Sequence, residues 1–381
     1  MRKRGYVLSD MGIVCALGAD AETVWRRLQA KDASGMKRLD GLSGGESTVF
    51  GFAEGLPRPA SVGERCALPV PRVGAIVDAA MAQIAGAVEA AKAEYGAGRV
   101  GAVVGTSNST MEEFTDNPDE IDMSWPARWI KSKWGLGGPC WAVSTACSSS
   151  AKVFASARRM LERELCDAVV VGGADAYTRT VVEGFHSLEA LSHNLTRPLS
   201  PDRDGINLGE GAAFFLMSRD AKAGGSGLAV ELLGVGESSD AYHQTAPDPS
   251  GAGAEAAMRL CLEDAGLSPC DVDFINLHGT GTRQNDAMEC AAVRRVFGGA
   301  EPADGDSPAA GLAVRAFSTK QLTGHCLGAA GAVEAALCWL ELRRRPCTCI
   351  SNSFAFGGSN ATVALSSRLS ETSLAAAEYS V

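Results

Sequence analysis

Short apolar runs alternate along the chain with segments whose apolar residues recur at helical spacing. Residues 99–107 (RVGAVVGTS), 166–176 (CDAVVVGGADA) and 211–218 (GAAFFLMS) are continuous apolar runs, which favours strands that are buried on both faces. Residues 76–95 and 148–164 have helical spacing instead. The alternation predicts an α/β protein with a mostly parallel sheet.

The second half of the chain has the same alternation. Residues 253–269 predict a helix that ends at Gly266, and residues 272–279 (VDFINLHG) predict a strand. A helix of small residues over 325–342 and a closing strand over 361–367 (ATVALSS) follow. Both halves of the chain therefore predict α/β structure.

A reactive residue precedes a helix of small residues in each half. Cys147 is followed by SSSAKVFASARRMLE and His325 by CLGAAGAVEAALCWLE, a weak internal similarity that predicts a duplicated fold. The polar, Gly-rich segment 220–228 is the best linker between the two units. We therefore expect halves at residues 1–219 and 226–381, whose two small-residue helices begin at one shared pocket.

Composition narrows the class of protein. The chain has 381 residues and a net charge of −10, with no basic run, which argues against binding to nucleic acid. An acidic partner would have to meet a local basic patch. No apolar stretch reaches the length of about 18 residues that spans a bilayer, and Asp10 interrupts the apolar run of the first residues, so a strand and turn are expected there rather than a secretion signal. We expect a cytoplasmic protein without membrane segments.

The 12 cysteines are scattered and include no Cys-x-x-Cys pair; the closest two are Cys347 and Cys349. In a cytoplasmic chain such cysteines are mostly small buried residues. We expect no metal site.

Cys147 has the sequence context of a nucleophile. It precedes a predicted helix, and the N-terminus of a helix presents unpaired N–H groups and a partial positive charge, which stabilise a thiolate. For a lone cysteine, a buried core residue is the simpler interpretation. Three further stretches of sequence favour the nucleophile over the core residue.

The first stretch, residues 274–289 (FINLHGTGTRQNDAME), places His278 where an apolar strand enters a Gly/Thr-rich turn. The second, residues 317–334 (FSTKQLTGHCLGAAGAVE), places Lys320 and His325 five residues apart. The third, residues 352–360 (NSFAFGGSN), has an aromatic residue before two glycines, so that backbone N–H groups can approach a ligand. Three other histidines lack such surroundings and are expected to be structural: His186, His193 and His243.

Together with TACSSS (145–150), these stretches resemble the β-ketoacyl synthase family of elongating condensing enzymes. The resemblance follows the order of the motifs over nearly the whole chain, from GIVCALG near the start to NSFAFGGSN near the end. It implies a thiolase-like fold in which duplicated βαβα halves form five layers, α/β/α/β/α. It also implies a decarboxylative Claisen condensation of an acyl group with malonyl-carrier protein, which lengthens the acyl chain by two carbons.

The resemblance assigns roles to five residues. Cys147 matches the nucleophile that accepts the acyl group. His278 and His325 match the pair that promotes decarboxylation of the malonyl thioester. Lys320 matches the lysine that orders this pair, and we expect Glu334 to be its ionic partner.

Four further residues match substrate-binding positions. Thr280 and Thr282 match the threonines that hold the pantetheine arm of the carrier protein. Phe356 matches the gating aromatic residue, whose N–H should form the oxyanion hole with that of Cys147. Arg203, in SPDRDG, matches a position at the tunnel entrance, and we expect it to contact the carrier protein.

The resemblance further implies the partners. Acyl carrier protein brings both substrates on its phosphopantetheine, and no other cofactor is expected. The chain should act as a dimer, either of two copies or with a related ketosynthase or chain-length subunit.

Three related classes of protein compete with this assignment, and the residues present argue against the first two. A thiolase would have a second cysteine in its last Gly-rich loop, where this chain has FAFGGSN, and an initiating condensing enzyme would have Asn in place of His325. A non-catalytic chain-length subunit would normally lack the nucleophile, whereas Cys147 is present. Such a subunit remains the alternative function.

Few residues of the resemblance bear on which acyl chain the protein prefers. The contexts STACSSSAKVFASA and DGINLGEGAA are most similar to synthases of aryl-polyene pigment clusters. The stretch 124–141 carries four tryptophans, which would either line the acyl tunnel or pack at a dimer interface. A polyene or aryl-polyene acyl chain is therefore expected slightly ahead of a saturated one.

Overall fold

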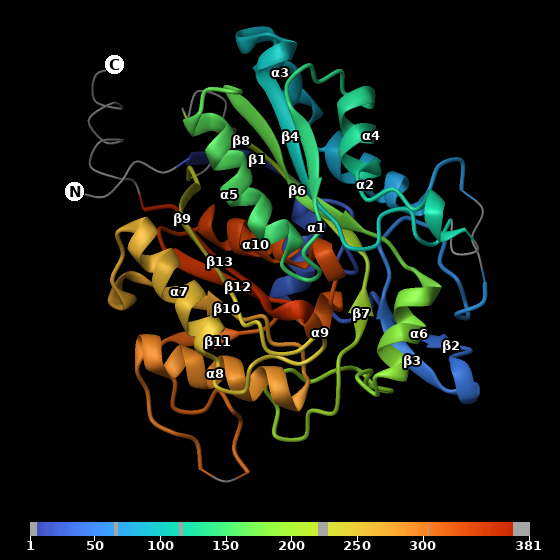
Figure 1. Cartoon of the computed structure of the whole chain (residues 1–381), viewed down its shortest axis with the longest axis vertical. Helices are drawn as coiled ribbons and strands as arrows, with labels where there is room; N and C mark the ends of the chain where they lie inside the picture. The colour runs from blue at the N-terminus through green and yellow to red at the C-terminus, as the bar shows by residue number, and fades with distance from the viewer. Residues whose placement is uncertain (1–5, 65–67, 114–116, 220–227, 304, 369–381) are drawn as a thin grey trace.

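The computed structural model describes residues 6–64, 68–113, 117–219, 228–303 and 305–368 (Figure 1). In these residues the strands form one sheet of ten strands and a smaller sheet of three. The large sheet contains, in spatial order, β11 (Arg315–Phe317), β10 (Phe274–Asn276), β12 (Thr348–Phe354), β13 (Ser359–Ser366), β9 (Glu231–Ser239), β1 (Tyr6–Val14), β8 (Gly211–Ser218), β6 (Ala168–Asp175), β4 (Val100–Gly105) and β5 (Cys140–Val143). The small sheet contains β2 (Met36–Asp40), β3 (Ser47–Gly51) and β7 (Leu208–Gly209).

The large sheet consists of two equivalent halves. In the first, β4 pairs parallel with β5 and β6, and β8 pairs antiparallel with β6 and β1. In the second, β10 pairs parallel with β11 and β12, and β13 pairs antiparallel with β12 and β9. The halves meet where β1 pairs with β9 through Tyr6 and Val7. The expected duplication is present, and the predicted linker between its halves lies almost wholly at 220–227, outside the described residues.

The prediction of a mostly parallel sheet was wrong. Each half ends in antiparallel strands: β13 follows β12 after only a short turn, and β8 runs opposite to β6 although α6 lies between them in the chain. A continuous apolar run shows that a strand is buried on both faces, but it carries no information on strand direction.

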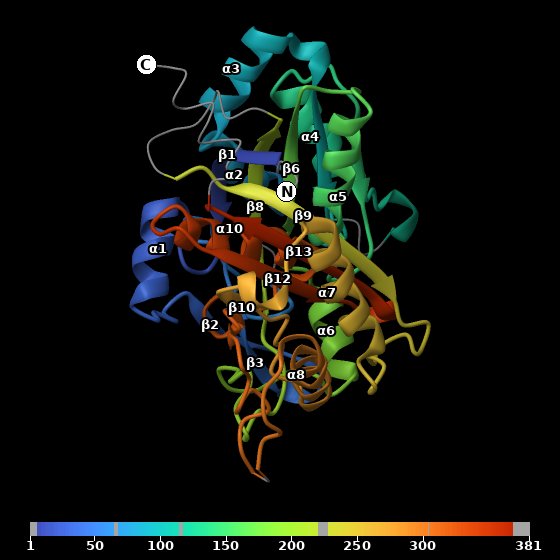
Figure 2. The ribbon, with the colours of Figure 1, turned by 90° about the vertical axis from the view of Figure 1, so that its left-hand side faces the viewer.

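Helices cover both faces of each half and also lie between the halves (Figures 1 and 2). Alternate residues of the strands face different cores: Val169 and Val171 pack with α5 and α10 in the middle, whereas Val170 packs under α2 and α4. Ile350 on β12 packs under α7 and α8 on the far side. The layers thus run helix, sheet, helix, sheet, helix. The helices are α1 (Ala21–Gln29), α2 (Arg72–Ala82), α3 (Ala85–Tyr95), α4 (Trp125–Lys133), α5 (Ser149–Glu162), α6 (Arg179–Ser187), α7 (Ala252–Ala265), α8 (Arg283–Phe297), α9 (Lys320–Thr323) and α10 (Ala330–Leu342).

The small residues of α5 and α10 let these two central helices touch. A Cβ atom on Gly331 of α10 would lie 2.7 Å from the backbone nitrogen of Ala151 on α5. The side chain of Ser150 closes the same contact, because its Oγ accepts a hydrogen bond of 2.9 Å from the Ala332 N–H. At its other side Ser150 packs on the end of β4, where a Cβ on Gly105 would lie 2.4 Å from the Ser150 Cα. Small residues at these positions bring both helix N-termini to one place.

The helix predicted over 76–95 is two helices, α2 and α3, bent by 70°. The break falls at Gln83, whose amide Nε2 donates to the carbonyls of Ile13 and Ala19 and whose Oε1 accepts from the Ile13 N–H. These hydrogen bonds tie the break to the end of β1, which local helical spacing cannot reveal. By length and composition, no single helix of the described segments could cross a membrane, whereas α2 and α3 taken together would meet that test.

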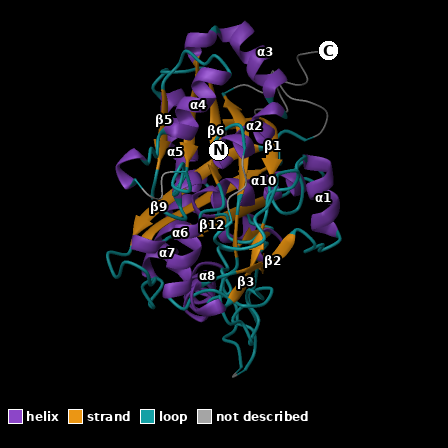
Figure 3. Cartoon of the chain, turned by 90° about the vertical axis from the view of Figure 1, so that its right-hand side faces the viewer, coloured by secondary structure: helices purple, strands orange, loops and turns teal. Residues whose placement is uncertain are grey.

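β2 and β3 of the small sheet lie beside α6 at the lower right of Figure 1, on the side that faces the viewer in Figure 3. Leu39, Phe50 and Tyr177 form a separate small core there. This side matters for the site, because α6 and the segment that follows it reach the catalytic pocket.

Candidate active site

One pocket of about 430 Å³ lies where the two halves meet, and it brings together most of the residues singled out in the sequence. Its walls include Cys147 from the first half and His278 and His325 from the second. The pocket is also lined by Thr280, Thr282 and Phe356. The described histidines His186, His193 and His243 do not line it and instead bond to nearby backbone groups.

Cys147 lies at the N-terminus of α5, after a turn in which Ala146 has a positive φ of 51°. The backbone N–H groups of Phe356 and of Cys147 itself point to the sulfur, and the Lys320 ammonium lies near enough to act on it; all three lower the pKa of the thiol. Burial nevertheless outweighs them and raises the pKa to about 11. The expectation of a stabilised thiolate was therefore wrong for the free enzyme, because a side chain only 7% exposed has lost its water.

His278 and His325 lie edge to face, with ring centroids 5.2 Å apart and planes at 86°. Burial lowers the pKa of both well below the usual value, and Lys320 lowers both further. Both imidazoles are therefore neutral at pH 7. Neither Nδ1 atom has a hydrogen-bond partner within the described part of the chain.

Lys320 is fully buried beside this pair. Its ammonium group donates to the carbonyl of His278 and forms an ion pair with Glu334 on α10. Burial raises the pKa of Glu334, although Lys320 lowers it. The structure thus brings the predicted ionic pair together behind the histidines.

Glu289 on α8 holds the backbone of the His278 turn, a role that sequence reasoning missed. Its two carboxylate oxygens accept hydrogen bonds of 2.8 Å from the N–H groups of His278 and Gly279, and Asn352 donates a third at 3.0 Å. Burial raises the pKa of Glu289 to about 7. A signal was present in the sequence, because Glu289 lies between Met288 and Cys290 on a helix whose neighbouring positions are apolar.

Asp175, at the end of β6, was also missed. Its buried carboxylate accepts from the N–H groups of Ser107 and Asn108 in the first half and from that of Gly328 in the second, at 2.6–3.0 Å. Gly328 follows His325 by three residues, so Asp175 joins the two halves beside the pocket.

Thr280 and Thr282 meet at the pocket, with their hydroxyl oxygens 2.9 Å apart. Thr282 also caps α8, because its hydroxyl accepts from the Asn285 N–H at 3.3 Å. The helix therefore positions both threonines.

Phe356 stacks on Phe185 of α6, with ring centroids 5.3 Å apart. The two following glycines have φ values of 77° and 75°, which residues with a side chain rarely adopt. The N–H of Gly357 donates to the Gln244 carbonyl at 2.7 Å, which holds this turn over the pocket.

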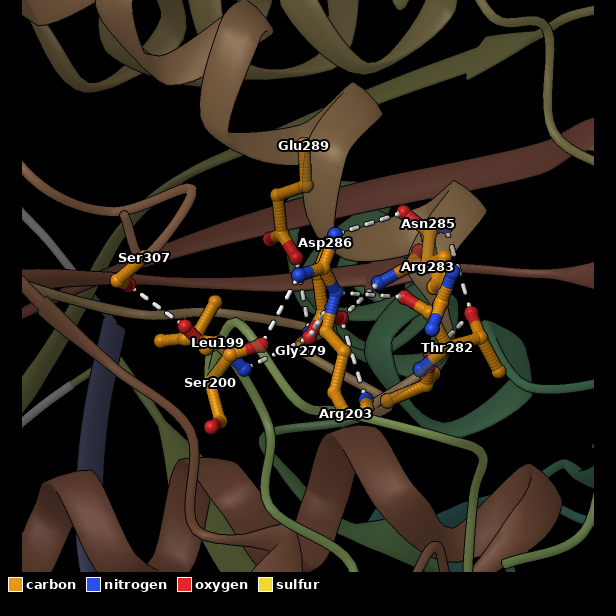
Figure 4. Close-up of polar contacts among 12 residues, drawn as sticks. Leu199, Ser200, Arg203, Gly279, Thr282, Arg283, Asn285, Asp286, Glu289 and Ser307 are labelled. Atoms are coloured by element: carbon orange, nitrogen blue, oxygen red, sulfur yellow. Dashed lines mark hydrogen bonds and ion pairs between the residues drawn. The ribbon is translucent and has the colours of Figure 1, made fainter. Parts of the chain in front are cut away.

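Arg203 lies where it cannot readily meet a carrier protein, because its side chain is 11% exposed. Figure 4 shows it turned inward between its own loop and the start of α8. Its guanidinium donates to the carbonyls of Ser200, Thr282 and Arg283 and lies 3.7 Å from the Asp286 carboxylate. These contacts favour a positioning role over the contact predicted from the sequence. The burial of the arginine could not be read from the motif SPDRDG.

The tryptophans lie away from the pocket. Trp125 and Trp129 of α4 stack with ring centroids 5.0 Å apart, and with Trp134 they pack on the outer face of the first half. Trp141 lies on the edge strand β5 and is 37% exposed. None of the described residues that line the pocket is a tryptophan, so the stretch does not build the walls seen here.

No group of three or more metal-binding side chains gathers anywhere in the described segments. The chain matches two family profiles, the N-terminal domain of β-ketoacyl synthase over residues 72–223 and the C-terminal domain over residues 229–352.

Curated relatives and solved structures agree with these profiles. A nodulation protein E of Rhizobium sp. (strain N33) is 32% identical over 89% of this chain and 86% of its own length. The 3-oxoacyl-[acyl-carrier-protein] synthase 2 of Coxiella burnetii is 31% identical over 96% of this chain and 99% of its own. A chain in the structure of the ketosynthase ApeO with its chain length factor ApeC, from Xenorhabdus doucetiae, has a TM-score of 0.82 and is 34% identical over 95% of this chain and 98% of its own. The chain belongs to the β-ketoacyl synthase family.

Proposed function

We propose that Cys147 holds the acyl group and that His278 and His325 act on malonyl-carrier protein in the condensation that this family catalyses. The observation that supports this assignment is a single pocket lined by all three side chains, with both imidazoles kept neutral. As a β-ketoacyl-[acyl-carrier-protein] synthase, the chain lengthens an acyl group by two carbons.

In the first step, the sulfur of Cys147 attacks the thioester carbonyl of the acyl carrier. The pantetheine sulfur leaves and takes up the proton that the cysteine loses, so one thioester replaces another. The N–H groups of Cys147 and Phe356, which point to the sulfur, would stabilise the negative charge on the carbonyl oxygen. The high pKa of the free thiol means that deprotonation has to accompany attack.

In the second step, malonyl-carrier protein loses CO₂ and negative charge develops on its thioester oxygen. Two neutral imidazoles donate N–H to that oxygen, and one such donor contributes about 3–4 kcal/mol of transition-state stabilisation. Burial of both rings, with the Lys320 ammonium beside them, keeps them from taking up a proton. The enolate carbon then attacks the acyl–Cys147 thioester, the bond from the carbonyl carbon to the cysteine sulfur breaks, and the released thiolate takes up a proton from solvent.

The hydroxyl groups of Thr280 and Thr282 would bind the amides of the pantetheine arm, since both face the pocket. In place of Arg203, we assign the carrier contact to Arg283, which lines the pocket and is exposed at its mouth. A cation there would offset the repulsion between an acidic carrier and a chain of net charge −10. No cofactor beyond the carrier's phosphopantetheine enters this scheme.

A dimer is proposed through the free edge of β5, where Trp141 is exposed. The similar structure of ApeO with its chain length factor supports a pair of related subunits. The intact Cys147, His278 and His325 favour the catalytic member of such a pair over the chain-length subunit. The described cysteines are free thiols, which supports work in the reducing cytoplasm.

For the acyl chain, we keep polyene and aryl-polyene groups ahead of saturated ones. The similarity to the structure that contains ApeO supports this order, whereas the tryptophans no longer do. Competition between a 2,4-dienoyl carrier and a saturated carrier of equal length tests it. Preference for the saturated carrier would contradict this order and indicate ordinary fatty-acid elongation.

Mass spectrometry of the intact protein tests the residue assignments. Incubation with acyl-carrier protein should add one acyl group to the wild type and to the His278→Ala and His325→Ala variants, but none to Cys147→Ala. Only the wild type should then condense with malonyl-carrier protein. Acylation of Cys147→Ala, or condensation by either histidine variant at the wild-type rate, would refute the scheme.

A further inference from the structure

A second cavity, of about 540 Å³, lies at the β11 end of the large sheet. It is larger than the pocket of Cys147 and shares none of its lining residues. Residues of α1 and α10, which lie side by side at this end of the sheet (Figure 2), form its walls together with β10 and β11.

The walls of the cavity are apolar. Phe317 of β11 stacks on Phe274 of β10 at a centroid distance of 5.6 Å, and leucines from three helices complete the surface. The leucines are Leu28, Leu322 and Leu337. Such walls suit a flat or elongated apolar body.

The rim is positively charged. Lys31 and Arg315 are exposed and line the cavity, and within the described segments neither has a hydrogen bond or ion pair to an acidic side chain. The Arg315 guanidinium lies 5.1 Å from the centroid of the Phe317 ring. The carboxylate at this rim, Glu341, is already paired with Arg345 at 2.6 Å. The rim thus suits an anion.

We propose that this cavity binds a small amphipathic carboxylate with a flat apolar body. The carboxylate lies between Lys31 and Arg315, and the apolar body lies against Phe317. An aryl alkenoic acid combines both features.

The cavity is separate from the catalytic pocket but lies directly behind it. Ser318, which lines the cavity, donates from its hydroxyl to the carbonyl of Gly279 at 2.7 Å and accepts from the Lys320 N–H at 3.3 Å. A ligand here would contact the segment that holds the His278 turn without entering the site of condensation.

Calorimetric titration tests the proposal. The probe cinnamate should bind one to one, and cinnamamide, which lacks the charge, should bind about tenfold more weakly, as expected for the loss of one ion pair. Absence of binding, or equal binding of the two compounds, would overturn the proposal.

Substitutions at the cavity test whether the ligand binds there. Gln321→Trp fills the mouth of the cavity from its exposed rim and should abolish binding, and Lys31→Glu and Arg315→Glu should each weaken it about tenfold. Arg58→Glu, at an exposed arginine outside both cavities, is the matched control and should bind as the wild type does. These four positions are exposed, so the variants should fold. Binding that is unaffected by the three cavity variants would assign the ligand elsewhere and refute the proposal.

Discussion

Replacing Glu289 by glutamine should change how the stability of the protein depends on pH. The carboxyl group is fully buried, and its pKa is raised from 4.5 to about 7. Between these two values the native state keeps the proton while the unfolded state has lost it. Rising pH therefore favours the unfolded state over this window, and the contribution that is present below pH 4.5 is gone above pH 7.

The size of the effect follows from the shift. One pKa unit corresponds to about 1.4 kcal/mol, so between pH 5 and pH 8 the wild type should lose about 2–3 kcal/mol of stability through this group. A glutamine side chain at this position cannot titrate. The Glu289→Gln variant should be less stable at pH 5, where it lacks the wild-type hydrogen bonds, and should recover about 2–3 kcal/mol relative to the wild type by pH 8.

Urea unfolding at pH 5, 6, 7 and 8, at one protein concentration, measures this difference. Glu255→Gln is the control, because Arg295 and Arg259 lower the pKa of Glu255, and that group is ionised in both states over this range. A difference between wild type and Glu289→Gln that stays constant from pH 5 to pH 8 would refute the reasoning. A pH-dependent difference in the control would show that another group is responsible.

Three further predictions concern the site and its frame. The rate of alkylation of Cys147 by iodoacetamide should rise about tenfold per pH unit from pH 7 to pH 10, because its pKa is about 11; a plateau below pH 9 would contradict that pKa. Arg283→Glu should raise KM for malonyl-carrier protein, more so at low salt, and leave the KM for a small malonyl thioester unaffected. Arg203→Ala should lower the free energy of unfolding by about 3 kcal/mol, because Asp286 loses its buried partner. The reverse pattern in kinetics and urea unfolding would favour Arg203 as the contact with the carrier protein. Gly331→Ala should destabilise the protein by about 1–3 kcal/mol through its clash with α5. The control Gly86→Ala, which has open space around its Cβ position, should raise the melting temperature. Equal melting temperatures of the two variants would argue against the close contact of the central helices.

The prediction from sequence succeeded where a signal is local. Strands such as β4 and β6 are recognisable from their own apolar residues. The residues Cys147, His278 and His325 are recognisable from the spacing and composition of the motifs around them. The structure brings these three residues into one pocket. The duplicated pattern predicted this for Cys147 and His325, and the family resemblance added His278.

The prediction failed where the outcome depends on residues far apart in the chain. The break between α2 and α3 depends on hydrogen bonds from Gln83 to Ile13, and the direction of β8 depends on its partners β6 and β1. The pKa of Cys147 depends on how completely the pocket is shielded from water. The inward turn of Arg203 depends on carbonyls at the start of α8.

The division of the pocket between the two halves has a consequence for synthesis on the ribosome. Cys147 leaves the ribosome long before His278 and His325 have been made, and α5 cannot be covered until α10 arrives. At a typical rate of about 5–20 residues per second, the thiol waits on the order of ten seconds or more for its partners. During that interval Cys147 is an ordinary exposed thiol with its usual lower pKa, so the nascent chain is more readily alkylated or oxidised than the finished enzyme. Docking of α10 against α5 both completes the site and removes that vulnerability.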